Sequence, residues 1–465
     1  MVAAKFRPAL PPRTFWRDPL FLLLVFAAVV LRWFFAQRRP DLLVEDADGY
    51  LAHAATLLEL GRFAGPFTGV STAFRPPGFV FLLSAPLWLG WSAAAAVLAV
   101  QLAMSLCCCW ATAALAMSIG LPRGMMLLAV AGVACDPLLV LYSIQPMSEV
   151  PCAAVLSVAL VLYLRSGVLG GVVDGGAGVW RGQLSGAAGA GLLFAAGGLI
   201  RPAVLLAAGC CFVAGAVMWL RSVWRRGRAS DGDVGGSRGQ LVLVCVAVCG
   251  FGVGLAPWVL RNGVVFGSFI PATTHGGYTL ALGNNPDFYR DVIHQPPGNA
   301  GNGYPWRGDR LDWWQRRTLK EAEMSGVRPG DERGLDRWYY SHAVSSIRGD
   351  WSGFLNACVL RLRRFWAITG TGGSGSAVKW LSGMWYACWW CGLAGAVVCR
   401  KRPAEVLMWL CVAVFCGLHL VYWTDTRMRA PVMPLLIVLS CGGMWRGYQR
   451  TRSRRSCGRT DQESM

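Results

Sequence analysis

Charged residues are scarce in this sequence. Asp, Glu, Lys and Arg together make up 15% of its 465 residues, whereas hydrophobic residues make up 55%. A soluble domain carries roughly a quarter charged residues, so an ordinary soluble protein is excluded. Apolar runs of about 18 residues or more recur along the chain, and each is long enough to cross a bilayer as a helix. The composition therefore indicates an integral membrane protein.

Histidine is scarcer still, with five residues, and no His-rich ligand set specifies a metal or another cofactor. Carboxylates are the groups that a divalent cation could use. The net charge of +19 does not indicate nucleic-acid binding, because much of the excess lies in short connections between apolar runs. In that position Lys and Arg orient membrane helices. The inner side also lacks a Gly-rich nucleotide-binding motif.

The hydropathy pattern predicts an all-α polytopic membrane protein with about ten transmembrane helices. A shorter apolar piece, 78–90, follows Arg75-Pro76-Pro77 and is predicted to be a re-entrant or interfacial half-helix, because it is too short to cross alone. We interpret the first run as a retained span, since no small-residue cleavage site follows it. The predicted spans are 19–36, 92–118, 124–141, 147–164, 186–200, 203–220, 240–260, 377–398, 404–422 and 430–446.

The basic clusters orient these spans. With the N-terminus inside, the 221–239 loop, Arg400-Lys401-Arg402 and the tail after Arg446 all fall on the inner side. This distribution follows the positive-inside rule and predicts a multi-pass protein of the plasma (inner) membrane, with both termini cytoplasmic. It divides the chain into four parts. An N-terminal transmembrane module, 1–261, includes the outer loop 37–77 and is followed by an extracytoplasmic segment, 262–376. A C-terminal transmembrane module, 377–446, and a basic cytoplasmic tail, 447–465, complete the division.

Both outer segments contain helical patterns. Residues 48–61 place Leu51, Ala54 and Leu58 on one face and end at Gly61, which is typical of a helix C-cap. Residues 335–366 have the pattern of one or two amphipathic helices. We therefore expect helices, and no large separate domain, outside the membrane.

The acidic run Glu45-Asp46-Ala47-Asp48-Gly49-Tyr50 is the first candidate for chemistry. Carboxylates at a membrane surface partly lose their solvation, which raises their basicity, and such a group can accept the proton of an attacking hydroxyl. The alternative is a structural role, in which Asp46 or Asp48 caps the following helix. From composition alone the structural role is favoured.

A second group consists of arginines and acids at the outer ends of spans: Arg75, Glu149, Arg201, Arg261, Asp425, Arg427 and Arg429. Arginine offers a forked donor suited to phosphate. Snorkelling anchors are the alternative. Residues from widely separated parts of the chain are nevertheless predicted to meet at one face, and this favours a site for an anion beside a basic carboxylate.

The order of these motifs resembles that of the polyprenyl-phosphate-sugar-dependent glycosyltransferases of the GT-C fold. The sequence is similar to the branch that holds protein O-mannosyltransferases, lipid A aminoarabinose transferases and Rgt-type galacturonosyltransferases. The resemblance covers most of the chain. It rests on the ordered set of an acid-x-x-x-Tyr loop, Phe74-Arg75-Pro76-Pro77-Gly78, Ser148-Glu149, Arg201-Pro202, Pro257-Trp258-x-x-Arg261-Asn262, Gly283-Asn284-Asn285-Pro286 and a late Asp-x-Arg-x-Arg-x-Pro.

The resemblance implies a role for each matching residue. Asp46, four residues before Tyr50, would be the general base, and Arg75, Arg201 and Arg261 would bind the donor phosphate. Supporting positions would be Asp48, Tyr50, Glu149, Asn284, Asp425, Arg427 and Arg429. Met428 stands where the family has Tyr, and Glu45-Asp46 stands where it has an Asp-Glu pair.

The implied activity is hexosyl or pentosyl transfer with inversion at the extracytoplasmic face of the cell envelope. A polyprenyl-phosphate-linked sugar would be the donor, and a hydroxyl of a lipid, glycan or protein the acceptor. The chief alternative is a transporter or flippase for lipid-linked sugars, which would require charges at mid-span and repeated broken helices. A non-catalytic membrane scaffold is the other. The predicted charges instead gather at one face.

Overall fold

Helices account for nearly all regular structure in the described part of the chain. The computed structural model describes residues 15–169, 177–226, 235–294, 308–369, 376–398 and 402–462. Within these ranges the strand-like pairing is confined to one isolated bridge, between Ala64 and Ser71. Parts of the predicted inner basic segments, including Arg400 and Lys401, lie outside the described residues.

The helices follow one another with short connections. In chain order they are η1 Phe15–Arg17, α1 Pro19–Arg38, η2 Pro40–Leu43, α2 Tyr50–Leu60, α3 Pro77–Trp88, α4 Ala93–Ser118, α5 Arg123–Ala134, α6 Pro137–Tyr142, α7 Glu149–Arg165, α8 Ala177–Ile200, α9 Ala203–Arg226, α10 Gly235–Phe266, α11 Gly276–Gly283, α12 Pro286–Phe288, η3 Tyr289–Ile293, α13 Asp309–Met324, α14 Glu332–Gly349, α15 Trp351–Phe365, α16 Ser376–Val398, α17 Pro403–Val421, η4 Thr426–Val432 and α18 Met433–Gln462.

Eight of the described helices are long and apolar enough to cross a membrane, which confirms an all-α polytopic membrane protein. They are α1, α4, α8, α9, α10, α16, α17 and the η4–α18 helix. Two of the ten predicted spans fall short of this length. The predicted span 147–164 is α7, with 17 residues, and the predicted span 124–141 is not one helix at all. The half-helix predicted at 78–90 is α3, with 12 residues.

The helix is interrupted between α5 and α6, and polar side chains hydrogen-bond the backbone groups that this interruption leaves free. Asp136 caps α6, and its Oδ1 accepts hydrogen bonds from the Leu138 and Leu139 amides at 3.1 and 3.0 Å. Arg32, buried in α1, donates from Nη1 to the carbonyl oxygen of Ala134 at 2.8 Å. Arg32 thus satisfies a backbone carbonyl at the end of α5, and Asp136 satisfies backbone amides at the beginning of α6.

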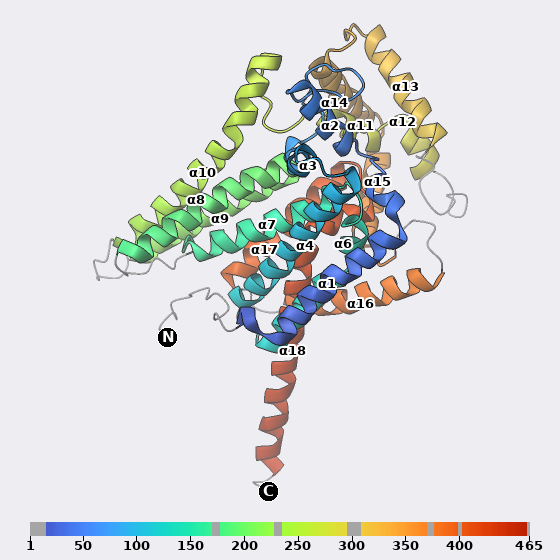
Figure 1. Ribbon diagram of the computed structural model, residues 1–465. Helices are drawn as coiled ribbons and strands as arrows, with labels where there is room; N and C mark the ends of the chain where they lie inside the picture. The colour runs from blue at the N-terminus through green and yellow to red at the C-terminus, as the bar shows by residue number, and fades with distance from the viewer. Residues whose placement is uncertain are drawn as a thin grey trace.

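The predicted helices of the outer segments are present. The predicted helix 48–61 contains α2, Tyr50–Leu60, which is capped at its C-terminus by Gly61, and the predicted helices at 335–366 correspond to most of α14 and to α15. In Figure 1, α2, α11, α12, α13 and α14 lie together at the top of the view, whereas the far end of α18 projects from the bottom. The two sets of elements therefore mark opposite ends of the molecule.

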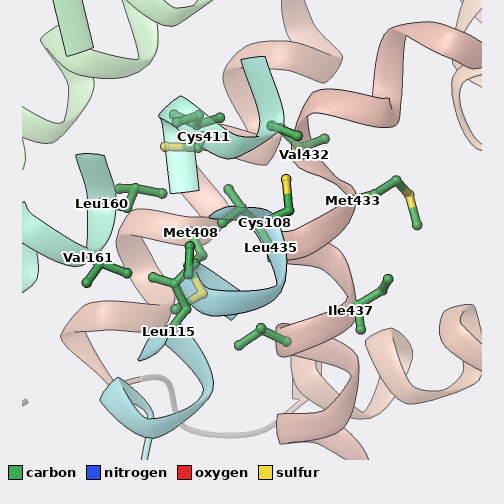
Figure 2. Close-up of a cluster of buried hydrophobic side chains, with 14 of the residues drawn as sticks. Cys108, Leu115, Leu160, Val161, Met408, Cys411, Val432, Met433, Leu435 and Ile437 are labelled. Carbon is green, nitrogen blue, oxygen red and sulfur yellow. The ribbon is translucent and has the colours of Figure 1, made fainter. Parts of the chain in front are cut away.

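A packed apolar core fills the middle of the helix bundle. Figure 2 shows its centre, where Cys108 and Leu115 of α4 face Leu160 of α7 and residues of α17 and α18. Leu115, Leu160, Leu435 and Ile437 are all 0% exposed. Because α7 and α17 also pack against η4, this core supports the segment that carries Arg427.

Candidate functional site

Five charged side chains from five separate segments meet at one end of the bundle. Asp48 follows α1 and precedes α2, Glu149 begins α7, and Arg427 lies in η4. Arg75 precedes α3, and Arg201 lies between α8 and α9. Two carboxylates pair with all three arginines, so these residues form one connected group. We refer to it as the arginine–carboxylate cluster.

Asp48 joins two of the arginines. Its Oδ1 lies 3.5 Å from Nη2 of Arg75, and its Oδ2 lies 3.3 Å from Nη1 of Arg427. Burial by itself would raise the pKa of Asp48, but the attraction of Arg427, Arg75 and Arg201 outweighs burial and holds the pKa below its ordinary value. Asp48 is therefore an ionised partner that orients arginines.

Glu149 joins the second pair of arginines. Its Oε1 accepts a hydrogen bond from Nη2 of Arg201 and lies 3.9 Å from Nε of Arg427. Its Oε2 is buried and has no hydrogen-bond partner among the described residues. Nε of Arg201 also donates to Oγ of Ser148 at 3.1 Å, and the Tyr50 hydroxyl donates to the same oxygen at 3.3 Å. Tyr50 is thereby linked to the cluster through Ser148.

The cluster is partly accessible. Three arginines pair with two carboxylates, and the neighbouring Asp425 also attracts Arg427. The Glu149 side chain is 0% exposed, but those of Asp48, Arg75, Arg201 and Arg427 are 17, 21, 14 and 23% exposed. Since the arginines keep an accessible edge, an anion can reach them without unfolding the site.

Local sequence explains how the loops present these residues. Gly49 has a φ of 76°, a left-handed conformation that favours glycine, and it turns the chain between Asp48 and α2. Pro76 and Pro77 fix the entry into α3 immediately after Arg75. Asp425 caps η4 by accepting a hydrogen bond from the Thr426 amide at 2.6 Å, which sets the turn that carries Arg427.

Asp46 lies in the same loop but has different partners. Its Oδ2 accepts a hydrogen bond from the Ala52 amide at 2.9 Å, inside the first turn of α2. Its Oδ1 is buried and has no hydrogen-bond partner among the described residues. In that part of the chain no arginine pairs with Asp46, whereas Asp48 has two such pairs. One Asp46 oxygen thus supports α2, and the other is left for a further hydrogen bond.

Four of the predicted site residues hydrogen-bond backbone groups. Arg261 donates from Nη1 to the Thr72 carbonyl and from Nη2 to the Phe63 carbonyl, both at 2.7 Å. Asn284 is buried and donates to the Val421 carbonyl at 2.8 Å. Arg429 is buried as well, donates to the Phe365 carbonyl at 2.9 Å and stacks on Tyr386. Asp425 is the fourth, as the cap of η4.

Sequence reasoning did not identify two charged residues that organise this region. Glu332, the first residue of α14, accepts hydrogen bonds from Thr72 and Ala73 of the first outer loop. Arg361 of α15 is 0% exposed and donates to the Leu420 carbonyl at 2.8 Å. Both belong to amphipathic helices rich in charge, so no local pattern separates them from solvent-facing neighbours.

His275 lies beside the cluster in a buried setting. Its ring contacts that of Phe74, with centroids 4.3 Å apart, and its Nδ1 lies 2.9 Å from Oγ1 of Thr279. Burial, with the Arg75 charge adding to it, lowers the pKa of His275 to about 3. The ring is therefore neutral at physiological pH and leaves the charge balance of the cluster unchanged. The described residues contain no group of three or more His, Cys, Asp or Glu arranged for a metal ion.

The arrangement of helices is similar to that of solved oligosaccharyltransferases. One structure is the archaeal oligosaccharyltransferase AglB from Archaeoglobus fulgidus, in complex with an inhibitory peptide and a dolichol-phosphate. It matches with a TM-score of 0.55 and 15% identity over 96% of this chain and 52% of that one. The oligosaccharyltransferase of the same organism, tethered to an acceptor peptide, matches with a TM-score of 0.55 and 15% identity over 96% and 51%.

The chain has a GT-C-like fold. It spans about half the length of the oligosaccharyltransferases that it matches. No family model and no curated protein matches its sequence. The likeness is therefore one of architecture, and the activity has to be argued from the residues of this chain.

Proposed function

We propose that this protein is a membrane glycosyltransferase that moves a sugar from a polyprenyl-phosphate donor to a hydroxyl acceptor at the extracytoplasmic face. The observation that carries the proposal is the arginine–carboxylate cluster, with three partly exposed arginines, at one end of a GT-C-like bundle. Guanidinium groups in this setting are suited to a lipid phosphate. AglB, which shares the architecture, is itself known in complex with a dolichol-phosphate and a peptide.

Donor binding is assigned to the arginines. Arg75, Arg201 and Arg427 surround Asp48 and Glu149, and the guanidinium groups hydrogen-bond the phosphate through their accessible edges. Ion pairs with the buried Glu149 hold Arg201 and Arg427 in place before the donor arrives, which reduces the reorganisation needed in the transition state. Arg261 contributes by holding the loop that carries Arg75, through its bonds to Thr72 and Phe63.

The reaction is a single displacement with inversion at the anomeric carbon. The acceptor oxygen attacks that carbon, the bond to the phosphate oxygen breaks, and the electron pair leaves with the lipid phosphate towards the arginines. Asp46 takes the hydroxyl proton, because its Oδ1 has no partner among the described residues, whereas both oxygens of Asp48 are engaged by arginine. General base catalysis of this kind contributes about 10²- to 10⁴-fold.

The contacts among the described residues favour the transferase over the transporter alternative. A pathway across the membrane would need polar groups along the bundle axis. The interior next to η4 is instead filled by the apolar core of Figure 2. Ion pairs Asp18–Arg123 and Glu405–Arg446 join helix ends at the other side of the bundle. These contacts favour chemistry at one face over passage through the molecule.

Release of polyprenyl phosphate tests the proposal. Purified protein is given a panel of polyprenyl-phosphate-linked hexoses and pentoses with lipid, glycan and peptide acceptors. We expect Asp46→Asn to lower kcat by about 10² or more, because the base is lost. Asp48→Asn should mainly raise the donor KM, because two arginines lose their partner. Asp41→Asn, which removes an exposed carboxylate paired with Arg39 in the same loop, is the matched control and should leave turnover unchanged.

Each alternative gives a different result in this assay. Full activity of Asp46→Asn would remove Asp46 from the mechanism. Wild-type protein that releases no polyprenyl phosphate from any donor, but moves lipid-linked sugar across sealed vesicles, would replace the transferase with a flippase. Retention of the anomeric configuration in the product would contradict the single displacement.

A further inference from the structure

Glu332 reaches from the segment 262–376 to the first outer loop. Its Oε2 accepts a hydrogen bond from the Thr72 hydroxyl at 2.6 Å, and its Oε1 accepts one from the Ala73 amide at 2.9 Å. The Thr274 hydroxyl also donates to Oε1. Three donors from two segments about 200 residues apart therefore converge on one carboxylate.

The loop is held from its other side by Arg261. Nη1 of Arg261 donates to the Thr72 carbonyl at 2.7 Å, so that Thr72 binds Glu332 through its side chain and Arg261 through its backbone. The Thr274 amide donates to the Ala73 carbonyl at 3.0 Å. Thr72 and Ala73 are thereby fixed on two sides and are 5 and 0% exposed.

This fixed point lies next to Arg75. The polar contact of Arg75 among the described residues is the one with Asp48, and at 3.5 Å it is long for a hydrogen bond. Its guanidinium also lies over the rings of Tyr50 and Phe74, with centroid distances of 6.0 and 5.6 Å. Contacts this weak do not fix a long side chain, so the position of Arg75 depends on its backbone. Pro76 holds that backbone on one side, and Thr72–Ala73 holds it on the other.

The helix that carries Glu332 is itself rigidly docked. One turn along α14, Oδ1 of Asp336 accepts a hydrogen bond from the Gly277 amide at 2.7 Å. A Cβ atom at Gly277 would lie 2.1 Å from the carbonyl oxygen of Asp336, so α11 and α14 touch backbone to backbone. Glu332 therefore projects from a platform that cannot follow a shift of the first outer loop.

We propose that Glu332 is a positioning residue that sets the location of Arg75 for the donor phosphate and couples the segment 262–376 to the site. This inference rests on the proposed function. Without Glu332, Thr72 and Ala73 lose their shared acceptor, and the backbone before Arg75 is released. Arg75 then engages the phosphate in only part of its conformations.

Kinetics of Glu332 variants test this role. We expect Glu332→Ala to lower kcat/KM by about 10- to 100-fold, because displacements near 1 Å have effects of this size. The loss should appear mainly in the donor KM, with binding of polyprenyl phosphate weakened by the same factor. The kcat/KM of Glu332→Gln should lie between those of the wild type and Glu332→Ala, because the amide keeps one acceptor oxygen. Asp331→Asn is the matched control, since Asp331 caps α14 through Gly334 and Asn also caps helices.

Two further measurements separate positioning from general damage. In an Arg75→Ala background, Glu332→Ala should cause no further loss, because the residue on which it acts is gone. Hydrogen exchange in residues 62–76 should rise in Glu332→Ala while the melting temperature in detergent stays close to that of Asp331→Asn. If Glu332→Ala does not fold, Glu332→Gln serves in the same experiments.

The outcomes distinguish this inference from the proposed function. Wild-type protein that transfers no sugar refutes the function, yet exchange in 62–76 and binding of polyprenyl phosphate still test Glu332. Unchanged exchange and unchanged binding in Glu332→Ala overturn the positioning role. A loss of equal size with and without Arg75 also overturns it, because Glu332 then acts through another residue.

Discussion

Two carboxylates one turn apart on α14 have different surroundings. Glu332 receives three hydrogen bonds from side chains and backbone, whereas Asp336 receives one, from the Gly277 amide. Burial raises the pKa of Asp336 to about 6 from its ordinary value of 3.8, and the charge of Glu332 adds to the effect. The single hydrogen bond from the Gly277 amide does not compensate the burial of Asp336.

The raised pKa of Asp336 predicts how stability depends on pH. The folded protein binds the Asp336 proton more tightly than the unfolded chain, so stability falls as pH rises from about 4 to about 6 and then levels off. Asp336→Asn keeps the acceptor for Gly277 but cannot ionise, so its melting temperature should fall less over this range. Melting curves in detergent between pH 4 and 8 measure the difference. Glu323→Gln, on exposed α13 surface, should retain the wild-type profile, and a profile unchanged in Asp336→Asn would contradict the prediction.

At the residue scale, the sequence predicted which charges gather but not what each one binds. Asp48, Arg75, Glu149, Arg201 and Arg427 were all predicted for one face, and they meet there. Arg261 and Arg429 fit the same pattern, yet they bind backbone carbonyls. A guanidinium suits a carboxylate, a phosphate or a carbonyl equally well, and the choice among them depends on tertiary contacts that no local pattern encodes.

At the scale of elements, the break between α5 and α6 shows where hydropathy misleads. An average over 124–141 hides one Asp and one Pro in an otherwise apolar run. Asp136-Pro137 is nevertheless a recognisable helix start, with an acidic cap followed by proline at the first helical position. The signal was present in the sequence, but the compensating Arg32 lies about 100 residues away and could not be paired with it.

Substitution of Arg32 tests how much its contacts at this interruption stabilise the protein. Arg32→Met should destabilise the protein by about 1 to 3 kcal/mol, because the Ala134 carbonyl loses a charged donor. Asp136 also loses a nearby positive charge. Unfolding in a mild-to-harsh detergent series measures the change. Val30→Met, on the exposed face of α1, is the control and should have little effect. In the double variant with Asp136→Asn, the loss should be smaller than the sum of the two single losses.

At the scale of the whole molecule, α2, which begins two residues after Asp48 of the cluster, lies at one end, and the projecting part of α18 lies at the other (Figure 1). From ten predicted spans and the basic inner segments, the sequence predicts that these two ends lie on opposite sides of the membrane. What the sequence could not predict is which residue Arg427 binds. Arg427 pairs with Asp48 across 379 positions, and such a contact has no local signal.

The polarity makes a topological prediction. Phe67, at the tip of the first outer loop, is 98% exposed, and Tyr448 on α18 is 54% exposed. Phe67→Cys should react with a membrane-impermeant maleimide in intact spheroplasts, whereas Tyr448→Cys should react only after permeabilisation. Maleimide labelling of the wild-type protein measures the background reaction of the native cysteines. The reverse pattern would invert the orientation and place the cluster on the cytoplasmic face.

The late position of Arg427 in the chain has a consequence for biosynthesis. Asp48, Arg75, Glu149 and Arg201 enter the membrane while the last spans are still on the ribosome, and Asp48 and Glu149 then face two arginines in place of three. A nascent or truncated chain that stops before residue 427 cannot hold the full set of charges. The arginine–carboxylate cluster is therefore completed only after η4 has been synthesised, at the end of insertion.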